Sequence, residues 1–422
     1  MTSLTELATK ILAISKQLEP YRNSESADSA TDSAKWLQTL PDDVDQGRLG
    51  LLDTLHELKT QIEGPVTALS DLIRKHTDVA SLHSLYGLRL PQHVPASGSV
   101  SYATVAQKCA VEERVLRRLF RYAMTNGMFT EPEPGFVAHT SLSRLLLEDP
   151  GAFDALGMTI EDLAPASLQL LKALQKYPAS SEPNETGFNI ANNTNLPIYE
   201  YIAQDPERAR RFGAGMMYFS HGDEFDLRHL ITAFPWDQHD REEVLLVDVG
   251  GGHGTVATKI ASATSKMRFI VQDMEKTVAM GKSLLPQELS SRIEFMAHDF
   301  LQEQTVKHAD FYFFRWIMHN WSDKYCVKIL QGLVPALKDG AKVLAFESVL
   351  GPPDTKPSNR AGSYLDMVML CAFNGATRTE EGWKQLFAES HPNFVFDGVT
   401  KIPGSALKLI QSTWVEPKNS TV

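Results

Sequence analysis

EVLLVDVGGGHGTVATKIAS (residues 243–262) joins a β-branched apolar run to a helical segment through a glycine-rich turn. Strand, turn and helix in this order are typical of the first unit of an α/β fold. Four further apolar runs follow, separated by helical segments: RFIVQDM, RIEFMAHDF, ADFYFFRWIMHN and GAKVLAFESVL. This alternation predicts a doubly wound, mostly parallel sheet in the C-terminal half of the chain.

Two more strand-like runs close the chain, NFVFDGVTKI and ALKLIQSTWV, with a short Pro-Gly-Ser turn between them. A parallel crossover needs a dozen or more residues, so this connection is too short for one. The final strand is therefore predicted to be antiparallel.

The bulk composition is that of an ordinary globular protein, and 422 residues suffice for two or three domains. With 41 basic and 52 acidic residues, the net charge of −11 disfavours general binding to nucleic acid or to an anionic membrane. The three cysteines lie far apart, so neither a zinc cluster nor a disulfide framework is expected, and no metal is predicted. The chain lacks a signal-peptide pattern and any apolar stretch of about 18 residues, which favours a cytoplasmic protein.

The first half of the chain is predicted to be mainly helical. MTSLTELATKILAISKQLEP has amphipathic helical spacing and precedes a polar linker at 22–35, and together they form an N-terminal region at 1–47. A helical domain is placed at 48–205 and the α/β domain at 206–422. One or two helices are expected over 205–234.

Within the helical domain, residues 101–149 show a winged-helix pattern: helix, turn, helix, two short strands around EPEPG, and a further helix. The second helix is rich in arginine, as DNA-reading helices are. The acidic chain and the nearby glutamates nevertheless favour a packing or dimerisation module. The arginines are Arg114, Arg117, Arg118 and Arg121, and the glutamates are Glu112, Glu113, Glu131 and Glu133.

The glycine-rich turn indicates a cofactor. Glycines allow positive φ and close approach of a ligand, and the helix that follows offers unpaired N–H groups. The dinucleotide motif G-x-G-x-x-G would need glycine where Thr255 stands, whereas Gly250, Gly252 and Gly254 form G-x-G-x-G. A turn without the extra spacing suits a ligand without a pyrophosphate, which favours S-adenosylmethionine (SAM) over NAD.

Two acids follow the next two strands. Asp273 ends FIVQD, where a carboxylate can accept both ribose hydroxyls. Asp299 ends FMAHD, where it can accept the adenine amino group while Phe300 packs on the ring. Each acid singly is equally consistent with a helix N-cap. Their order at successive strand ends favours the cofactor interpretation.

Six motifs carry a family resemblance: VDVGGGHG, FIVQD, HDF, FRWIMHNWSD, KVLAFES and NGATRTEEGW. In this order they resemble the plant-type small-molecule O-methyltransferases of the caffeate and flavonoid type, in their fungal secondary-metabolite branch, from about residue 90 onward. The resemblance implies a winged-helix-like dimerisation domain, hence a homodimer. It also implies a class I SAM-dependent methyltransferase domain with a seven-stranded sheet and an antiparallel last strand. The implied reaction moves the SAM methyl group to a hydroxyl of a small aromatic, polyketide or alkaloid-type natural product and releases S-adenosylhomocysteine.

The resemblance assigns catalysis to His319, which follows a buried strand-like run. A neutral imidazole can take the acceptor proton as the methyl group moves, although a histidine at such a place can also serve packing alone. Glu347 interrupts the apolar run KVLAFES, where an unpaired carboxylate is costly. Two roles are possible for the Glu347 carboxylate: an ion pair with a lysine or arginine or, as the resemblance implies, the orientation of His319. Ser322 or Asp323 is expected to cap the next helix.

Two sets of binding residues are also implied by the resemblance, and each member is alternatively an ordinary packing residue. The cofactor set is Asp248, Gly250, Gly252, Gly254, Asp273, Met274, Asp299, Phe300, Arg315 and Ser220. The acceptor set contains methionines and aromatic side chains that suit a flat apolar ring. Its members are Phe212, Met216, Met318, Asp366, Met367, Leu370, Phe373 and Asn374.

One departure from the family pattern lies in NGATRTEE, where Thr377 stands in place of a frequent glutamate. It keeps open an alternative function, a SAM-retaining pericyclase or isomerase, although an intact pair of His319 and Glu347 favours methyl transfer. A DNA-binding regulator and a nicotinamide-dependent oxidoreductase are weaker alternatives. The acidic charge opposes the first and the missing final glycine opposes the second.

Overall fold

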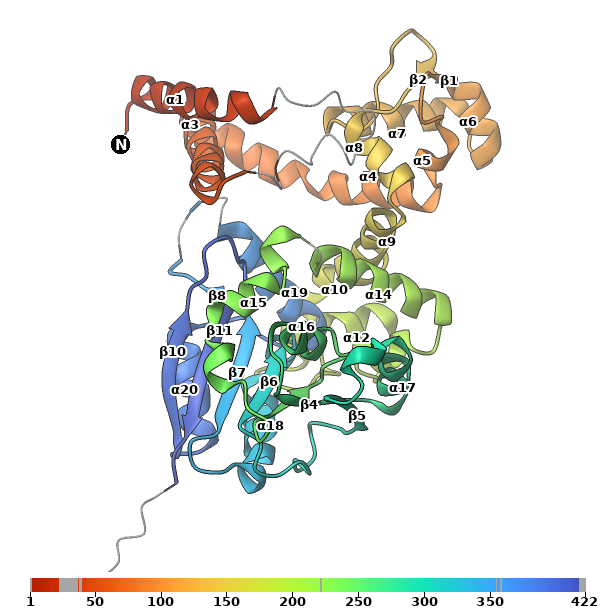
Figure 1. Cartoon of the computed structure of the whole chain (residues 1–422). Helices are drawn as coiled ribbons and strands as arrows, with labels where there is room; N and C mark the ends of the chain where they lie inside the picture. Colours follow the sequence, from red (N-terminus) through yellow and green to blue (C-terminus); the bar gives the residue numbers. More distant parts are fainter. Residues whose placement is uncertain are drawn as a thin grey trace, which may run out of the picture. The chain divides into compact units, whose positions relative to one another are not determined.

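The computed structural model describes residues 2–22, 37, 40–220, 222–353, 355–356 and 359–416 (Figure 1). Two compact units are present. The first comprises Met1–Leu168, Tyr199–His221 and Asp354–Ala361, and the second comprises Gln169–Ile198, Gly222–Pro353 and Gly362–Val422. The predicted linker at 22–35 lies outside the described residues, apart from Arg22, which ends the first helix.

The first unit begins with a helical pair. Helix α1 (Leu4–Arg22) is the predicted N-terminal helix and packs on α3 (Asp42–Arg74), which Gly64 interrupts at φ +68 just before Pro65. The other helices of this unit are α4 (His76–Gly87), α5 (Leu90–His93), α6 (Tyr102–Cys109), α7 (Glu113–Thr125), α8 (Ser141–Glu148), α9 (Pro150–Met158), the π-helix η2 (Thr159–Leu163), α10 (Ala164–Leu168), α13 (Ile198–Ile202) and α14 (Pro206–Ser220).

The winged-helix pattern is present over residues 100–148. Strand β1 (Val100–Ser101) pairs antiparallel with β2 (Phe136–Val137), and a single bridge between Thr130 and Ala138 closes the EPEPG turn. Helix α7 buries an apolar face in the core of this module. On its other side Arg114 and Arg117 pair with neighbouring glutamates at 2.7 Å, as a solvated face does.

The second unit contains the predicted α/β sheet. Its seven strands lie in the order β10-β11-β7-β6-β3-β4-β5. The five strands from β3 to β7 are parallel, and β11 is antiparallel to both β7 and β10, which confirms the prediction for the final strand. The strands are β3 (Leu245–Val249), β4 (Arg268–Asp273), β5 (Ile293–Ala297), β6 (Phe311–Arg315), β7 (Lys342–Glu347), β10 (Phe394–Thr400) and β11 (Lys408–Trp414).

Helices cover both faces of the sheet, as an alternating chain requires, since helical residues take part in the core cluster on each face. Two short strands, β8 (Val349–Leu350) and β9 (Arg378–Thr379), form a separate parallel pair. The helices of this unit are α11 (Leu170–Lys176), α12 (Gly187–Asn192), η3 (Asp223–Phe225), α15 (Arg228–Ala233), η4 (Trp236–His239), α16 (Thr255–Ala263), α17 (Glu275–Leu284), η5 (Gln287–Leu289), η6 (Met318–Asn320), α18 (Asp323–Leu333), η7 (Val334–Ala336), α19 (Arg360–Phe373) and α20 (Glu380–Ser390).

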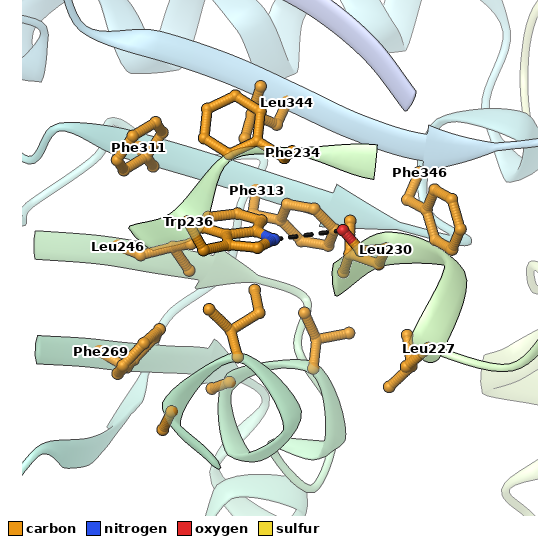
Figure 2. Close-up of a cluster of buried hydrophobic side chains, with 14 of the residues drawn as sticks. Leu227, Leu230, Phe234, Trp236, Leu246, Phe269, Phe311, Phe313, Leu344 and Phe346 are labelled. Carbon is orange, nitrogen blue, oxygen red and sulfur yellow. Dashed lines mark hydrogen bonds between the residues drawn. The ribbon is translucent and has the colours of Figure 1, made fainter. Parts of the chain in front are cut away.

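Buried strands with alternating side chains give the sheet a core on each face. Leu246, Phe311 and Phe313 belong to one cluster, and Val247 and Tyr312 belong to the cluster on the opposite face. Figure 2 shows the first cluster, where the indole of Trp236 packs among the strand side chains and donates a 3.2 Å hydrogen bond to the Leu230 carbonyl. This packing fixes the carboxyl edge of the parallel strands, where the predicted site residues stand.

In the described part of the chain, no helix combines the length and apolar character that crossing a bilayer requires.

Candidate active site

The glycine turn between β3 and α16 adopts a conformation that only glycine takes without strain. Gly250, Gly252 and Gly254 have φ of +69°, +58° and +80°. A Cβ on Gly250 would lie 2.6 Å from Ile317 Cδ1, and one on Gly254 would lie 2.8 Å from Phe295 Cζ. At Gly252, by contrast, no atom of the described residues lies within 4 Å of the Cβ position, so the turn has one open side.

Asp273 is fixed beside this open side. Its Oδ2 accepts the N–H of Gly252 at 2.9 Å and its Oδ1 accepts the N–H of Met274 at 2.8 Å. The carboxylate at the tip of β4 therefore stands next to the glycine turn, where the sequence predicted it. The Met274 side chain is exposed.

Asp248 is a buried carboxyl beneath the same turn. A Cβ on Gly251 would lie 2.6 Å from its Oδ2, and this oxygen has no hydrogen-bond partner in the part of the chain that the structure describes. Burial raises the pKa of the Asp248 carboxyl to about 7, against the lowering effects of a bond from the Ala257 backbone and of the Arg315 charge. The Asp248 carboxyl thus packs against the backbone of the glycine turn at Gly251.

Arg315 ends β6 and supplies a partly buried positive charge. Its Nη2 donates to the Phe225 carbonyl at 3.2 Å. Burial lowers the pKa of Arg315, while the charges of Asp248 and Glu347 raise it. The guanidinium therefore lies within electrostatic reach of two buried carboxyl groups.

Asp299 and Phe300 follow β5. Asp299 is exposed and its Oδ1 accepts the N–H of Leu301 at 2.9 Å within a turn, so its contact is not the helix N-cap considered as an alternative. Phe300 reaches the glycine turn, since its Cε1 lies 3.6 Å from the Cβ position of Gly250, and it meets Trp321 edge-on at 5.9 Å.

His319 lies in the short helix η6, and its side chain is buried next to Glu347. Nδ1 lies 3.1 Å from Glu347 Oε2, an ion-pair distance, although the N–H does not point well enough at the oxygen for a hydrogen bond. Nε2 has no hydrogen-bond partner among the described residues. One ring nitrogen thus faces a carboxylate, and the other is available to a ligand.

The turn that carries His319 is held in an unusual backbone conformation. Trp316, at the end of β6, has φ +58°, which is strained for a bulky residue. Its ring lies 5.1 Å from the His319 ring, and its Nε1 forms no hydrogen bond with any described residue. Strain of this kind persists only where the surroundings over-determine it.

Two residues of this site were missed by sequence reasoning. A Cβ on Gly375 would lie only 2.2 Å from the His319 carbonyl oxygen, so the chain passes against the His319 turn at a glycine. Arg378, 6% exposed, donates to the carbonyls of Met318 and Trp321. Both stand in NGATRTEE, and an arginine among small residues there was the available signal.

The prediction that Ser322 or Asp323 caps α18 is confirmed for the position of Ser322, but Ser322 makes no side-chain capping bond there. Ser322 occupies the N-cap position, but its Oγ donates to the Ser181 carbonyl at 2.9 Å. The Asp323 carboxylate instead accepts from Arg378 Nε at 2.8 Å. Longer-range partners compete successfully for both side chains.

The predicted acceptor residues of the second unit differ in exposure. Met318 and Phe373 are buried in the core, Leu370 is partly buried and Met367 is 49% exposed. Asn374 donates through Nδ2 to the Glu182 and Glu185 carbonyls at 2.8 and 3.1 Å.

Thr377, at the departure from the family pattern, is buried, and none of the described residues forms a hydrogen bond with its hydroxyl. Its N–H donates to Asp366 Oδ1 at 2.8 Å, so Asp366 fixes the backbone at this point.

Three predicted residues belong to α14 in the first unit. Phe212 is buried and meets Tyr199 at right angles, with 6.1 Å between the ring centroids. Met216 is 40% exposed and accepts a 3.9 Å contact from the Tyr199 hydroxyl. Ser220 donates to the Met217 carbonyl at 3.0 Å.

Two family profiles match the chain: an O-methyltransferase domain over residues 178–391 and an O-methyltransferase dimerisation domain over residues 70–149. Chlorophenol O-methyltransferase from Trichoderma longibrachiatum is 32% identical over 97% of this chain and 90% of its own. O-methyltransferase AMT9 from Alternaria alternata is 35% identical over 88% of this chain and 87% of its own.

Solved structures share the fold. The crystal structure of OxaC has a TM-score of 0.76 at 21% identity, over 96% of this chain and all of its own. A structure titled "A Pericyclic Reaction enzyme" has a TM-score of 0.72 at 23% identity, over 90% of this chain and 98% of its own. At these identities the likeness concerns architecture, and the class I methyltransferase fold is confirmed. From its family profiles and its relatives, the chain belongs to the O-methyltransferase family and is a SAM-dependent O-methyltransferase with an N-terminal dimerisation domain.

Proposed function

We propose that this enzyme methylates a hydroxyl of a small aromatic natural product, with His319 as general base and Glu347 as the residue that orients it. One observation carries the proposal: His319 Nδ1 lies 3.1 Å from Glu347 Oε2, and the described residues leave Nε2 without a partner. This is the arrangement that a general base held by a carboxylate needs.

The chain's own contribution is to hold and move a proton. A neutral imidazole is a proton acceptor, and His319 Nε2 takes the hydroxyl proton as the oxygen attacks the methyl group. Proton removal of this kind contributes roughly 10²–10⁴ in rate. Glu347 stabilises the imidazolium that forms, because its Oε2 faces the second ring nitrogen. SAM, when bound, supplies the methyl group as an electrophile.

The glycine turn fits SAM. Gly252 presents backbone with no atom near its Cβ position, beside the anchored carboxylate of Asp273, and α16 begins immediately beyond the turn. A small backbone surface next to a ribose-binding carboxylate is the combination that a nucleoside ligand requires. The proposed cofactor residues are Asp248, Gly250, Gly252, Gly254, Asp273, Met274, Asp299, Phe300, Arg315 and Ser220.

The acceptor is proposed to be a flat, mainly apolar hydroxylated ring. A relative named as a chlorophenol O-methyltransferase and another named for a grayanic acid biosynthesis cluster support this class. The residue types predicted for the acceptor are mainly apolar, with Asp366 and Asn374 as polar exceptions. The proposed acceptor residues are Phe212, Met216, Met318, Asp366, Met367, Leu370, Phe373 and Asn374.

The proposed assembly is a homodimer through the N-terminal domain, supported by the dimerisation profile at 70–149. Its proposed location is the cytoplasm, where the free thiols of Cys109, Cys326 and Cys371 stay reduced.

The domain boundaries proposed from the sequence lie at 47/48 and 205/206. Expression of residues 206–422 alone tests the second boundary, because a separate domain should fold without the rest of the chain.

Incubation of the full-length enzyme with SAM and a panel of chlorinated and polyketide-type phenols tests the reaction. We expect methyl ether and S-adenosylhomocysteine in equal amounts. His319→Ala should abolish the product while SAM binding, measured by calorimetry, persists. Substitution of an exposed histidine on α4, His76→Ala, should change neither. Turnover of an acceptor without S-adenosylhomocysteine would instead indicate the SAM-retaining pericyclase or isomerase.

A further inference from the structure

The guanidinium of Arg378 makes an unusually complete set of contacts. Nη1 donates to the carbonyls of Met318 at 3.0 Å and Ala376 at 3.2 Å. Nη2 donates to the Trp321 carbonyl at 3.0 Å and to Cys326 Sγ at 3.3 Å. Nε donates to Asp323 Oδ1 at 2.8 Å. With a buried side chain, every nitrogen of the fork is used.

These contacts converge on the turn that carries His319. Met318 and Trp321, whose carbonyls Arg378 binds, stand immediately before and two residues after the histidine. Glu347 holds the donors of the same segment, because its Oε1 accepts the N–H groups of Ile317 and Met318, each at 2.9 Å. Around the His319 imidazole, the Glu347 carboxylate thus binds backbone N–H groups and the Arg378 guanidinium binds backbone carbonyls.

The two clamping residues are themselves linked through backbone pairing. Glu347 ends β7, and β8 begins two residues later at Val349. Val349 is the register partner of Arg378 in the parallel pair of β8 and β9. Gly375 allows this strand to approach, since any Cβ there would collide with the His319 carbonyl. A displacement of the Arg378 side chain is therefore expected to move the Met318 and Trp321 carbonyls relative to Glu347.

We infer that Arg378 is a positioning residue for methyl transfer, which sets where His319 Nε2 stands by holding the Met318 and Trp321 carbonyls. The inference rests on the proposed role of His319 as general base. A planar fork with five fixed donors suits this task and a lysine does not, because an ammonium group cannot reach two carbonyls and a carboxylate in one geometry. A misplacement of a base by about 1 Å costs on the order of 10²-fold in rate.

A purely structural role is the competing explanation. Asp323, the anionic partner of Arg378, is 69% exposed, so the ion pair itself lies at the surface and the buried contacts are those to the His319 turn. Arg292 provides a matched comparison in the same unit. It is partly buried and donates to the Ala261 and Met267 carbonyls at the far end of α16, outside the His319 turn.

The experiment compares full-length Arg378→Lys and Arg292→Lys with the wild type, with 2,4-dichlorophenol as the acceptor probe. We expect kcat of Arg378→Lys to fall by about 10–10²-fold, while Kd for SAM changes by less than about threefold. Hydrogen exchange of the peptide covering 316–322 should accelerate in Arg378→Lys only. In Arg378→Ala, added methylguanidine should restore part of kcat. Asp323→Asn should show a smaller loss of kcat in a stably folded protein.

The outcomes are distinguishable. Equal kcat and equal exchange at 316–322 in Arg378→Lys and wild type would overturn the inference. Loss of kcat, SAM binding and melting temperature together in both lysine variants would also overturn it, as a merely structural effect. The exchange measurement needs no acceptor, so it decides the matter even where the probe is not methylated. Should His319→Ala methylate as fast as wild type, the proposed function itself fails, whatever Arg378 does.

Discussion

Glu347 contacts both the imidazole of His319 and the backbone that precedes it. Its Oε2 lies 3.1 Å from the imidazole Nδ1, while its Oε1 accepts the N–H groups of Ile317 and Met318, each at 2.9 Å. The carboxylate is 1% exposed, so replacing it leaves buried donors and a buried ring without partners. The same side chain therefore sets both the backbone and the proton arrangement of the proposed base.

Glu347→Gln should lower kcat by on the order of 10²-fold or more with little change in Kd for SAM. A glutamine can keep its oxygen on the Ile317 and Met318 amides, and its NH2 then faces Nδ1. That contact favours the ring tautomer with the proton on Nε2, which cannot accept a proton from a hydroxyl. Steady-state kinetics and calorimetry on the folded variant test this, and an unchanged kcat would show that Glu347 does not set the tautomer.

Gly252→Ala should weaken SAM binding more than it weakens the fold. The position has φ +58° but no atom within 4 Å of the Cβ site, so alanine meets backbone strain of about 1–2 kcal/mol and no clash. The new methyl group occupies the open side of the turn. Gly340→Ala is the matched control, because Gly340 has φ +79° and equally open surroundings away from the turn. Equal SAM affinities in the two variants would place the cofactor elsewhere.

Gly375→Ala should reduce both kcat and stability. Its Cβ would lie 2.2 Å from the His319 carbonyl oxygen and 2.7 Å from the Asn320 carbonyl carbon, so one segment must move. Overpacking of this kind costs about 1–3 kcal/mol. Gly351→Ala, with no atom within 4 Å, should be neutral in urea unfolding and in turnover. A fully active Gly375→Ala enzyme would mean that the His319 turn tolerates displacement.

Thr377→Val should leave stability unchanged or raise it by about 1 kcal/mol, because it removes a buried hydroxyl that has no hydrogen-bond partner among the residues described. Thr54→Val is the control, since the buried Thr54 hydroxyl donates to the Gly50 carbonyl at 2.7 Å and its loss should destabilise. Retained methyl transfer in Thr377→Val would show that the Thr377 hydroxyl is not required for the reaction. A lower melting temperature in Thr377→Val would reveal a partner for the hydroxyl.

Much of the fold was predictable from sequence because its strands are long apolar runs that end in polar residues. The sheet, the antiparallel last strand and the helix–turn–helix order all follow from local pattern. The pairing of His319 with Glu347 was anticipated from the family resemblance, and the parallel pairing of β6 with β7 brings the ends of both strands to one edge of the sheet.

The contacts around the His319 turn were not predictable in this way. Arg378 binds carbonyls about sixty positions earlier in the chain, and backbone carbonyls carry no sequence signal. Gly375 is explained by the approach of two segments that no local spacing relates. Ser322 has the right residue type for a side-chain cap, yet the Ser181 carbonyl binds its hydroxyl instead. Tertiary partners override local preference in each case.

Asp248 should make the protein less stable as pH rises from about 4 to about 7. Burial raises the pKa of this carboxyl to about 7 in the folded chain, while an unfolded aspartate titrates near 4. Between these values the folded state retains a proton that the unfolded state has lost, so the free energy of unfolding falls with rising pH. The slope from one group approaches about 1 kcal/mol per pH unit within this window and vanishes above it.

Urea unfolding of wild type, Asp248→Asn and the exposed control Glu294→Gln at pH 5, 6 and 7 isolates this effect. We expect the stability difference between wild type and Asp248→Asn to shift against the wild type as pH rises, because only the wild type must bury a charge. Glu294→Gln should follow the wild type at every pH. A difference that is independent of pH would mean that Asp248 ionises normally in the folded state, with Arg315 compensating fully for its burial.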